Sequence, residues 1–294
     1  MIARRKDFAL FLLVAFGAAW VLACGPWLDG QGLQSGLWLH TGAAMMMFAP
    51  ALGVLAVWRY RRLPWSALFS QNGLRLGARP RRTAWLTVIA WLGAPLFLWA
   101  AFGLSVLFGV YVFDFPSPAI VAAVVVDAVT VSTLGTVPFA LGEELGWRGW
   151  LMPQLTGRLG STGGIIATGV IWALWHAPLT LLGYNYPNLG AWAVVAFIGF
   201  CVPLGAILGW LRMYTGSIWP CVVAHAAING SAMLFGLFNS SAHQANPLYA
   251  GCGFVGWGVL TVIAAVLFTW FPVHRVAVRS ETFVAPANSW PSFG

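Results

Sequence analysis

Long apolar stretches, separated by short polar or charged segments, run along almost the whole chain. A helix needs about 20 mostly apolar residues to cross a hydrocarbon core of about 30 Å, and eight stretches meet that length. They are predicted to be helices, because backbone groups in lipid need internal partners and the alternating segments of a membrane barrel do not occur. Their approximate limits are Phe8–Leu28, Leu37–Trp58, Ala84–Tyr111, Ala119–Leu141, Thr162–Leu182, Ala191–Leu211, Ile218–Phe238 and Gly251–Phe271.

Composition points to the same class of protein. Only 7% of the 294 residues are charged and 60% are hydrophobic, whereas a soluble domain is about 25% charged because its surface faces water. These values exclude a disordered chain, a secreted disulfide scaffold and a cytosolic enzyme. The expected fold is an all-α, polytopic bundle of about eight membrane-spanning helices.

No chemical role is assigned to the cysteines or to the tryptophans. The four cysteines have no CxxC spacing and are interpreted as small core residues; they are Cys24, Cys201, Cys221 and Cys252. The 18 tryptophans are interpreted mostly as lipid-facing or interfacial anchors.

The basic residues fall in alternate connections between the predicted spans. With eight spans, all 15 Lys and Arg residues lie on one side of the membrane. Positive residues stay cytoplasmic during insertion, so both termini are predicted to be cytoplasmic. The arginine-rich connection Arg59–Arg82 is therefore interpreted as a topology signal, and no nucleic-acid partner is expected.

The chain is expected to form one transmembrane domain over residues 1–279. The apolar stretch after the basic start is too long for a signal peptide and is interpreted as a retained first span. No internal repeat supports an inverted-repeat transporter. Residues 280–294 are predicted to be a disordered tail.

Ionisable residues inside a span are costly, so each is a candidate functional residue. Asp127 lies within the fourth span, and Glu143 and Glu144 lie at its cytoplasmic end. His176 and His225 also lie inside spans. The others are placed in termini, loops or near span ends; they are Asp7, Asp29, His40, Asp114, His243, His274 and Glu281.

The segment from Gly142 to Arg148 combines two glutamates with an arginine. Glu144 and Arg148 are four residues apart on one helix face, so they can pair. Glu143 points about 100° away and has no such local partner, which leaves it free to hold and release a proton. A purely structural salt bridge at the helix end is the alternative.

His176 is expected to lie at a disturbed part of its helix. Pro178, two residues later, should break the hydrogen-bond pattern and free a carbonyl. Trp172, one turn earlier, should pack under the imidazole. A structural histidine with its own partner is the alternative interpretation.

His225 and Asn229 lie four residues apart and share a face of an otherwise apolar helix. They therefore need partners in the bundle interior. An interhelical hydrogen bond that serves packing alone is one alternative, and a Cys221–His225 metal pair is another.

Three spans thus contribute one polar cluster each. A carboxylate, two imidazoles and an amide that converge could activate water and stabilise an oxyanion, as peptide hydrolysis requires. The side chains of Glu143, His176 and His225 could instead ligate zinc and leave a fourth position for water. The residues leave both chemistries open.

These clusters resemble the motifs of a known family, the CAAX protease and bacteriocin-processing (CPBP, or Abi) intramembrane proteases. Its pattern EExxxR, FxxxH and HxxxN on separate helices reads here as Glu143-Glu144-x-x-x-Arg148, Trp172-x-x-x-His176 and His225-x-x-x-Asn229. The resemblance covers roughly 142–230. Trp172 departs from the pattern, which often has Phe at this position.

The resemblance implies a role for each motif residue. Glu143 with His176 would activate the attacking water, and His225 with Asn229 would form the oxyanion hole. Glu144 and Arg148 would support the geometry of the glutamates. The family implies either a metal-free glutamate mechanism or zinc held by the Glu and His residues, and its relatives cleave prenylated CAAX proteins or act in bacteriocin immunity.

The predicted span limits place these residues at unequal depths. With Glu143 at the rim, His225 would lie about 10 Å and His176 about 20 Å inside the core. Either the next span begins after Thr162, or the glutamate helix is longer, or both. We predict that this helix continues through Arg148, partly submerged, beside a cavity open to the cytoplasm. A separation of Glu143 and His176 above about 12 Å would refute a shared site.

The sequence therefore predicts an integral-membrane endopeptidase that acts on a membrane-associated or lipid-modified peptide or protein. One alternative is a transporter in which Glu143, Asp127 and the histidines relay protons. A non-catalytic bacteriocin-immunity protein that acts by binding is the other. The spacing Gly205-x-x-x-Gly209 permits close helix packing, within or between chains.

Overall fold

Every regular element of the described residues is helical, as predicted for an all-α bundle. The computed structural model describes residues 3–115, 117–238 and 246–273. His243, His274, Glu281 and the tail 280–294 lie outside these ranges. The elements are α1 (Arg5–Ala23), α2 (Gly25–Leu28), η1 (Gly32–Gln34), α3 (Gly36–Met46), α4 (Ala49–Arg61), α5 (Trp65–Gln71), α6 (Pro80–Leu107), α7 (Pro118–Asp127), η2 (Ala128–Ser132), α8 (Thr133–Glu144), η3 (Leu145–Leu151), α9 (Met152–Trp175), α10 (Ala177–Leu181), α11 (Trp192–Thr215), α12 (Trp219–Leu237) and α13 (Phe254–Trp270).

Each of the eight predicted apolar stretches is helical, and the first, second and fifth are divided, the fifth into α9 and α10. The first stretch becomes α1 and α2, and the second becomes α3 and α4, with a break before Pro50. Proline has no backbone N–H and is tolerated in the first turn of a helix, so α4 starts there. In the described part of the chain, five helical segments are long and apolar enough to cross a membrane, which makes this a multi-pass membrane protein; the count of eight spans stays a prediction.

The fourth stretch does not end where the sequence suggested. α7, η2, α8, η3 and α9 follow one another without a gap from Pro118 to Trp175. The predicted continuation of the glutamate helix through Arg148 is confirmed, because η3 carries the helix on to Leu151. The chain changes direction at Gly160, whose φ of 72° and ψ of 170° lie outside the helical region; glycine adopts such a conformation without steric cost.

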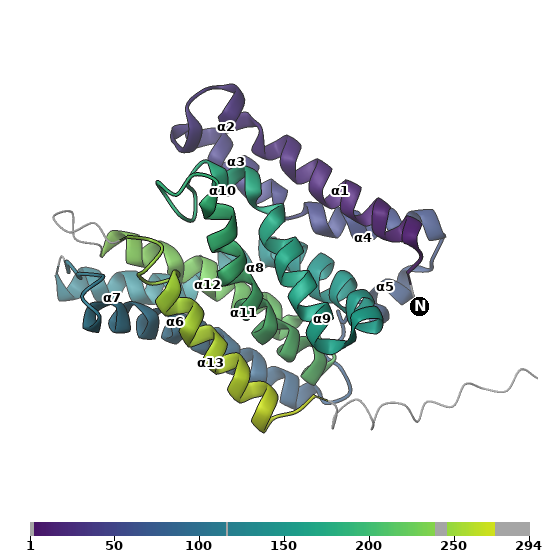
Figure 1. The fold of residues 1–294 in the computed structure, drawn as a ribbon. Coiled ribbons are helices and arrows are strands. Elements are labelled where there is room, and N and C mark those ends of the chain that lie inside the picture. Colours follow the sequence, from purple (N-terminus) through teal and green to yellow (C-terminus); the bar gives the residue numbers. More distant parts are fainter. Residues whose placement is uncertain (1–2, 116, 239–245, 274–294) are drawn as a thin grey trace, which may run out of the picture.

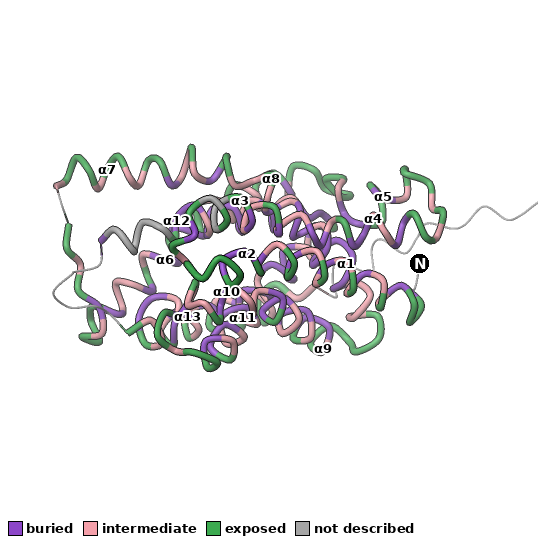
Figure 2. Tube along the Cα trace, turned by 90° about the horizontal axis from the view of Figure 1, so that it is seen from above, coloured by how far each residue is buried: buried purple, intermediate pink, exposed green. Residues whose placement is uncertain are grey.

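α11 and α12 form the middle of the bundle. α11 packs against α9 and α13, while α12 packs against α6 and α8. Figure 1 shows α1 beside α4 on one flank and α6 beside α13 on the opposite flank. α7 lies at the margin, and Figure 2 shows it mostly exposed.

Residues of the basic segments meet at one end of the bundle. Arg61 pairs with Asp7, Arg158 donates to the carbonyl of Ala3, and Arg82 lies over the ring of Tyr214. This gathering agrees with the predicted segregation of charge. Arg148 is the exception, because it is fully buried in η3 instead of lying in a connection.

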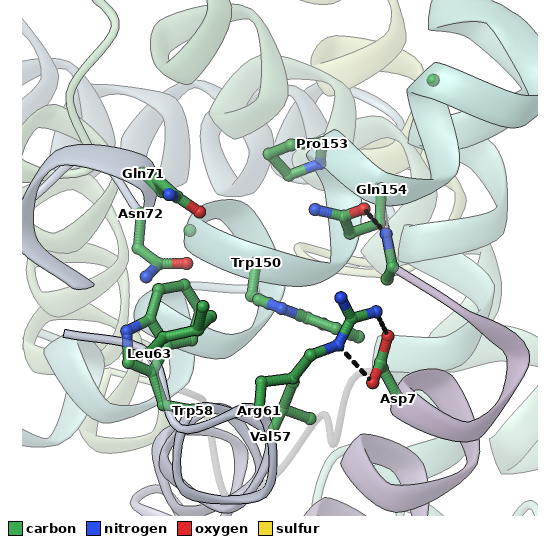
Figure 3. A pocket seen from close by; sticks show the side chains of 13 residues that line it. Asp7, Val57, Trp58, Arg61, Leu63, Gln71, Asn72, Trp150, Pro153 and Gln154 are labelled. Atoms are coloured by element: carbon green, nitrogen blue, oxygen red, sulfur yellow. Dashed lines mark hydrogen bonds and ion pairs between the residues drawn. The ribbon is translucent and has the colours of Figure 1, made fainter. Parts of the chain in front are cut away.

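The interpretation of Asp7 as an ordinary terminal residue is wrong. Asp7 is 1% exposed in the first turn of α1, and its Oδ1 accepts a hydrogen bond of 2.8 Å from Arg61 Nε. Figure 3 shows this ion pair in the wall of a cavity of about 380 Å³. The pair ties the start of α1 to the end of α4, because a carboxylate buried at this level needs a partner.

The cysteines divide into two groups. Cys201 and Cys221 are buried, as predicted, but Cys24 is exposed and Cys252 is half-buried. Cys221 Sγ lies 3.1 Å from the carbonyl of Leu208. This contact satisfies the thiol within the α11–α12 interface.

The glycines of α11 serve packing within this chain. A Cβ added at Gly205 would lie 3.6 Å from the Cα of Gly169 in α9, and one at Gly209 would lie 3.0 Å from Met152 Sδ. Small residues allow such close approach of two helix backbones. The predicted close contact is therefore an α9–α11 contact.

Gly169→Ala is expected to destabilise the protein by about 1–3 kcal/mol. The new Cβ would lie 2.8 Å from the Cα of Val202, and a backbone atom cannot move aside as a side-chain tip can. Gly103→Ala in α6 is the matched control, because no atom lies within 4 Å of its Cβ position. Chemical unfolding in detergent measures both, and equal stability of the two variants would contradict the close-contact argument.

Candidate active site

The two glutamates lie where α8 and η3 press closely on the α3–α4 break. Gly142 and Gly146 flank the glutamates on one helix face, and a Cβ added there would lie 2.7 Å from the carbonyl of Met47 and 2.3 Å from Pro50 Cβ, respectively. Only glycine fits such close approach. Glu143 and Glu144 are consequently turned into the bundle, and they are 1% and 0% exposed.

Glu144 binds both Arg148 and His225 through the same oxygen. Its Oε1 accepts hydrogen bonds from Arg148 Nη1 at 2.7 Å and from His225 Nδ1 at 2.9 Å. The predicted Glu144–Arg148 pair is confirmed, and it extends to α12. Since a carboxylate accepts and does not donate, the proton of His225 is at Nδ1, and its Nε2 is left for another partner.

Arg148 is buried with spare hydrogen-bond donors. Its side chain is 0% exposed, and its guanidinium carbon lies 4.2 Å from the ring centroid of Trp172. Among the described residues, Arg148 Nε and Nη2 and Glu144 Oε2 have no hydrogen-bond partner. A buried charge needs such partners, so this group can bind a polar ligand that enters the site.

The prediction that Glu143 lacks a local partner is wrong. Its Oε2 accepts hydrogen bonds from two indole N–H groups, Trp172 Nε1 at 2.7 Å and Trp147 Nε1 at 3.2 Å. Trp147 is four residues after Glu143 and so lies on the same helix face. Within the described part of the chain no side chain donates to Oε1, which leaves that oxygen available to a water molecule.

His176 lies at the predicted helix break. α9 ends at Trp175, and the N–H of His176 bonds to Ala173 instead of Trp172. The carbonyl of Trp172 is thereby freed and lies 2.8 Å from His176 Nδ1. A carbonyl only accepts, so Nδ1 carries the proton and Nε2 has a free lone pair.

Trp172 holds the two histidines next to the glutamate. Its ring centroid lies 6.0 Å from that of His176 and 5.4 Å from that of His225, while its N–H donates to Glu143. The predicted packing of Trp172 against His176 is confirmed. These contacts keep Glu143 and His176 within the limit of about 12 Å for a shared site.

Asn229 lies one turn beyond His225 on α12 and is half-buried. Its placement agrees with the shared helix face predicted from the spacing. Asp127, by contrast, is exposed on α7 and accepts a hydrogen bond of 2.5 Å from Ser132. Asp127 is therefore not part of the buried cluster.

The two indole donors were missed by the sequence interpretation, which treated tryptophans as membrane anchors. Trp147 is 0% and Trp172 is 3% exposed, so neither faces lipid. The spacing of four between Glu143 and Trp147 was the available signal, because it places a donor beside a carboxylate. Trp172 carried no comparable signal, because it comes from another helix.

The side-chain arrangement does not fit a metal site. In residues 3–115, 117–238 and 246–273, no three His, Cys, Asp or Glu side chains are grouped so that they could hold a metal ion. Glu143 Oε2 already accepts two N–H groups, and the Arg148 guanidinium lies over the adjacent Trp172. Positive partial charges at these positions disfavour a cation beside that oxygen.

The cavity beside the Asp7–Arg61 ion pair is lined by residues next to Arg148 and not by the glutamate–histidine cluster itself. Gly149 and Trp150, which follow Arg148 directly, line it, whereas Glu143, His176 and His225 do not. Trp150 crosses the middle of the cavity in Figure 3. The cavity predicted beside the glutamates is not this one and stays a prediction.

The fold and the cluster define a multi-pass membrane protein with a buried glutamate–histidine site. Residues 125–231 match a family model described as type II CAAX prenyl endopeptidase Rce1-like. A protein of Methanococcus maripaludis named CAAX prenyl protease 2 is 33% identical over 92 residues, which make up 30% of this chain and 34% of that relative.

The resemblance to the CPBP proteases is thus confirmed, and residues 125–231 are the part of the chain that carries it. The matched segment contains the whole cluster, from Glu143 to Asn229. The match spans about a third of the length of the curated relative.

Proposed function

We propose that this protein is an intramembrane endopeptidase in which Glu143 and His176 activate a water molecule. The observation that carries the proposal is the double indole hydrogen bond on Glu143 Oε2, beside two imidazoles whose Nδ1 atoms are both bound. Glu143 Oε1 and His176 Nε2 remain as acceptors, and a water between them can donate both of its protons. Such positioning of a base and a nucleophile is what general base catalysis needs.

The hydrolysis follows from these protonation states. The water gives a proton to Glu143 Oε1 while its oxygen attacks the peptide carbonyl, and the same proton then passes to the leaving amine as the C–N bond breaks. His225, as an imidazolium that carries protons at both Nδ1 and Nε2, donates from Nε2 to the oxyanion, and the amide of Asn229 donates as well. Glu144, 2.9 Å from His225 Nδ1, stabilises the imidazolium that this donation requires.

No metal takes part in these steps. The resemblance left zinc as an expectation, but the described residues contain no group of three His, Cys, Asp or Glu side chains that could hold a metal ion. We propose the metal-free glutamate mechanism, with a peptide or protein that carries a prenyl group as substrate, by analogy with the name of the archaeal relative.

Cleavage of a prenylated CAAX-type peptide by the purified protein in liposomes tests this function. Mass spectrometry is expected to detect release of the peptide C-terminal to the prenylated cysteine, at a rate that a chelator does not change. Metal analysis of the same active sample provides the control. Proton flux across the liposome membrane without peptide cleavage would support the transporter instead, although the exposed position of Asp127 argues against a relay.

Trp172→Phe is expected to lower kcat by about 10- to 100-fold with little change in KM. The variant keeps the ring but loses the N–H that binds Glu143, and a hydrogen bond to a charged group contributes about 1.5–3 kcal/mol. Trp175→Phe is the matched control, because its N–H donates to the carbonyl of Ala15 and not to the site. An unchanged kcat for Trp172→Phe would show that the indole does not position the base.

A further inference from the structure

A second, apolar groove lies on the lipid-facing side of the bundle, away from the cluster of Glu143. Its volume is about 720 Å³, and α6, α11, α12 and α13 form its walls. α6 packs against α12 and α13, and α13 packs against α11. Of the residues that line the groove, Arg82 alone is charged.

Arg82 is held at one end of the groove by an aromatic stack. Its guanidinium carbon lies 3.6 Å from the ring centroid of Tyr214, and Tyr214 stacks on Trp210 with centroids 4.3 Å apart. Trp210 Nε1 in turn donates to the carbonyl of Phe271 at 2.9 Å. α6, α11 and α13 together therefore fix the position of this positive charge.

Among the described residues, no carboxylate pairs with Arg82. The ion pairs of the described residues join Asp7 to Arg61, and Glu144 to Arg148 and His225. Arg79 and Arg81, its neighbours in the sequence, are exposed. This end of the groove consequently favours an anionic ligand.

The groove is long enough for one lipid chain. The lining residues of α6 extend from Arg82 to Phe97, which corresponds to about 22 Å of helix at 1.5 Å per residue. That length exceeds half of a hydrocarbon core of about 30 Å. A single chain that starts at Arg82 can therefore lie along the groove within one leaflet.

We propose that this groove binds an anionic phospholipid, with one hydrocarbon chain along α6 and its phosphate on Arg82. A peptide fits poorly, because its backbone would find no hydrogen-bond partners along the apolar walls. Ala224 and Ile228 line the groove from α12, whereas Glu143, His176 and His225 do not line it. The lipid would thus bind on the side of α12 that carries Ala224 and Ile228, outside the glutamate–histidine cluster. This proposal does not depend on the proposed proteolysis.

Two pairs of variants test the site in neutral detergent. Arg82→Gln removes the charge, and Gly93→Leu fills the groove, since no atom lies within 4 Å of its Cβ position. Arg81→Gln and Gly103→Leu are the matched controls, because they lie on the same helix outside the groove. The probes are phosphatidylglycerol and phosphatidylcholine with identical acyl chains.

Phosphatidylglycerol is expected to raise the Tm of the unmodified protein and of both controls more than phosphatidylcholine does. Arg82→Gln should weaken binding about fivefold, as one basic side chain near a lipid headgroup contributes about 1 kcal/mol, and Gly93→Leu should abolish the Tm rise. If Gly93→Leu does not fold, the comparison of Arg82→Gln with Arg81→Gln decides. Equal effects of the two lipids, or an unchanged response of Arg82→Gln, would overturn the proposal.

Discussion

Glu143→Gln is expected to lower kcat by about 10²- to 10⁴-fold, the range of a general base. Glutamine has nearly the same shape, and its amide oxygen can still accept the hydrogen bonds of Trp147 and Trp172. It cannot take a proton from water. The loss should therefore appear in kcat with the fold intact, and single-turnover cleavage of a prenylated peptide in liposomes measures it.

Asp127→Asn provides the control for this variant, because Asp127 is an exposed acid on α7. Its kcat should equal that of the unmodified protein. Full activity of Glu143→Gln on a validated substrate would rule out Glu143 as the base. A different outcome is a Glu143→Gln protein that no longer cleaves peptide but keeps full protection in an immunity assay. That result would show that the protein confers immunity by binding.

Glu144→Gln is expected to destabilise the fold by about 3–5 kcal/mol. The substitution leaves Arg148, which is 0% exposed, without its counter-charge. Removing one partner of a buried ion pair costs this much because the other charge stays desolvated. Chemical unfolding in detergent, followed by circular dichroism, measures the change.

Two comparisons separate this charge effect from general damage. The double variant Glu144→Gln with Arg148→Gln should regain part of the stability, because neither charge is then buried alone. Asp7→Asn should cost less, since the Arg61 side chain is 15% exposed and water can solvate it. A double variant less stable than Glu144→Gln by the full cost of Arg148→Gln alone would show that the two residues are not coupled.

The helices and the order of the polar clusters could be predicted because both follow local patterns. Each predicted hydrophobic stretch is helical, and the spacing of four residues places Arg148 beside Glu144. Pro178 likewise marks the helix break at His176. Each of these features depends on residues that are close in the sequence.

Interactions between distant segments could not be predicted in this way. The ion pair of Asp7 with Arg61 joins two helices, and no sequence period records it. The hydrogen bond from Trp172 to Glu143 joins residues of different helices. A hydropathy scale does not indicate this hydrogen bond either, because it counts tryptophan as a large apolar ring and ignores the indole N–H, which is a hydrogen-bond donor.

The turn at Gly160 has a consequence for how the protein is made. Glu143 and His176 lie on the two arms of one hairpin whose bend is this glycine, so contacts near in the sequence bring them together and such contacts form early. During synthesis the base and its partner can meet before α12 leaves the ribosome. In the proposed mechanism His225 is the last component to arrive, so the newborn chain is expected to lack peptidase activity until its seventh apolar segment has been inserted.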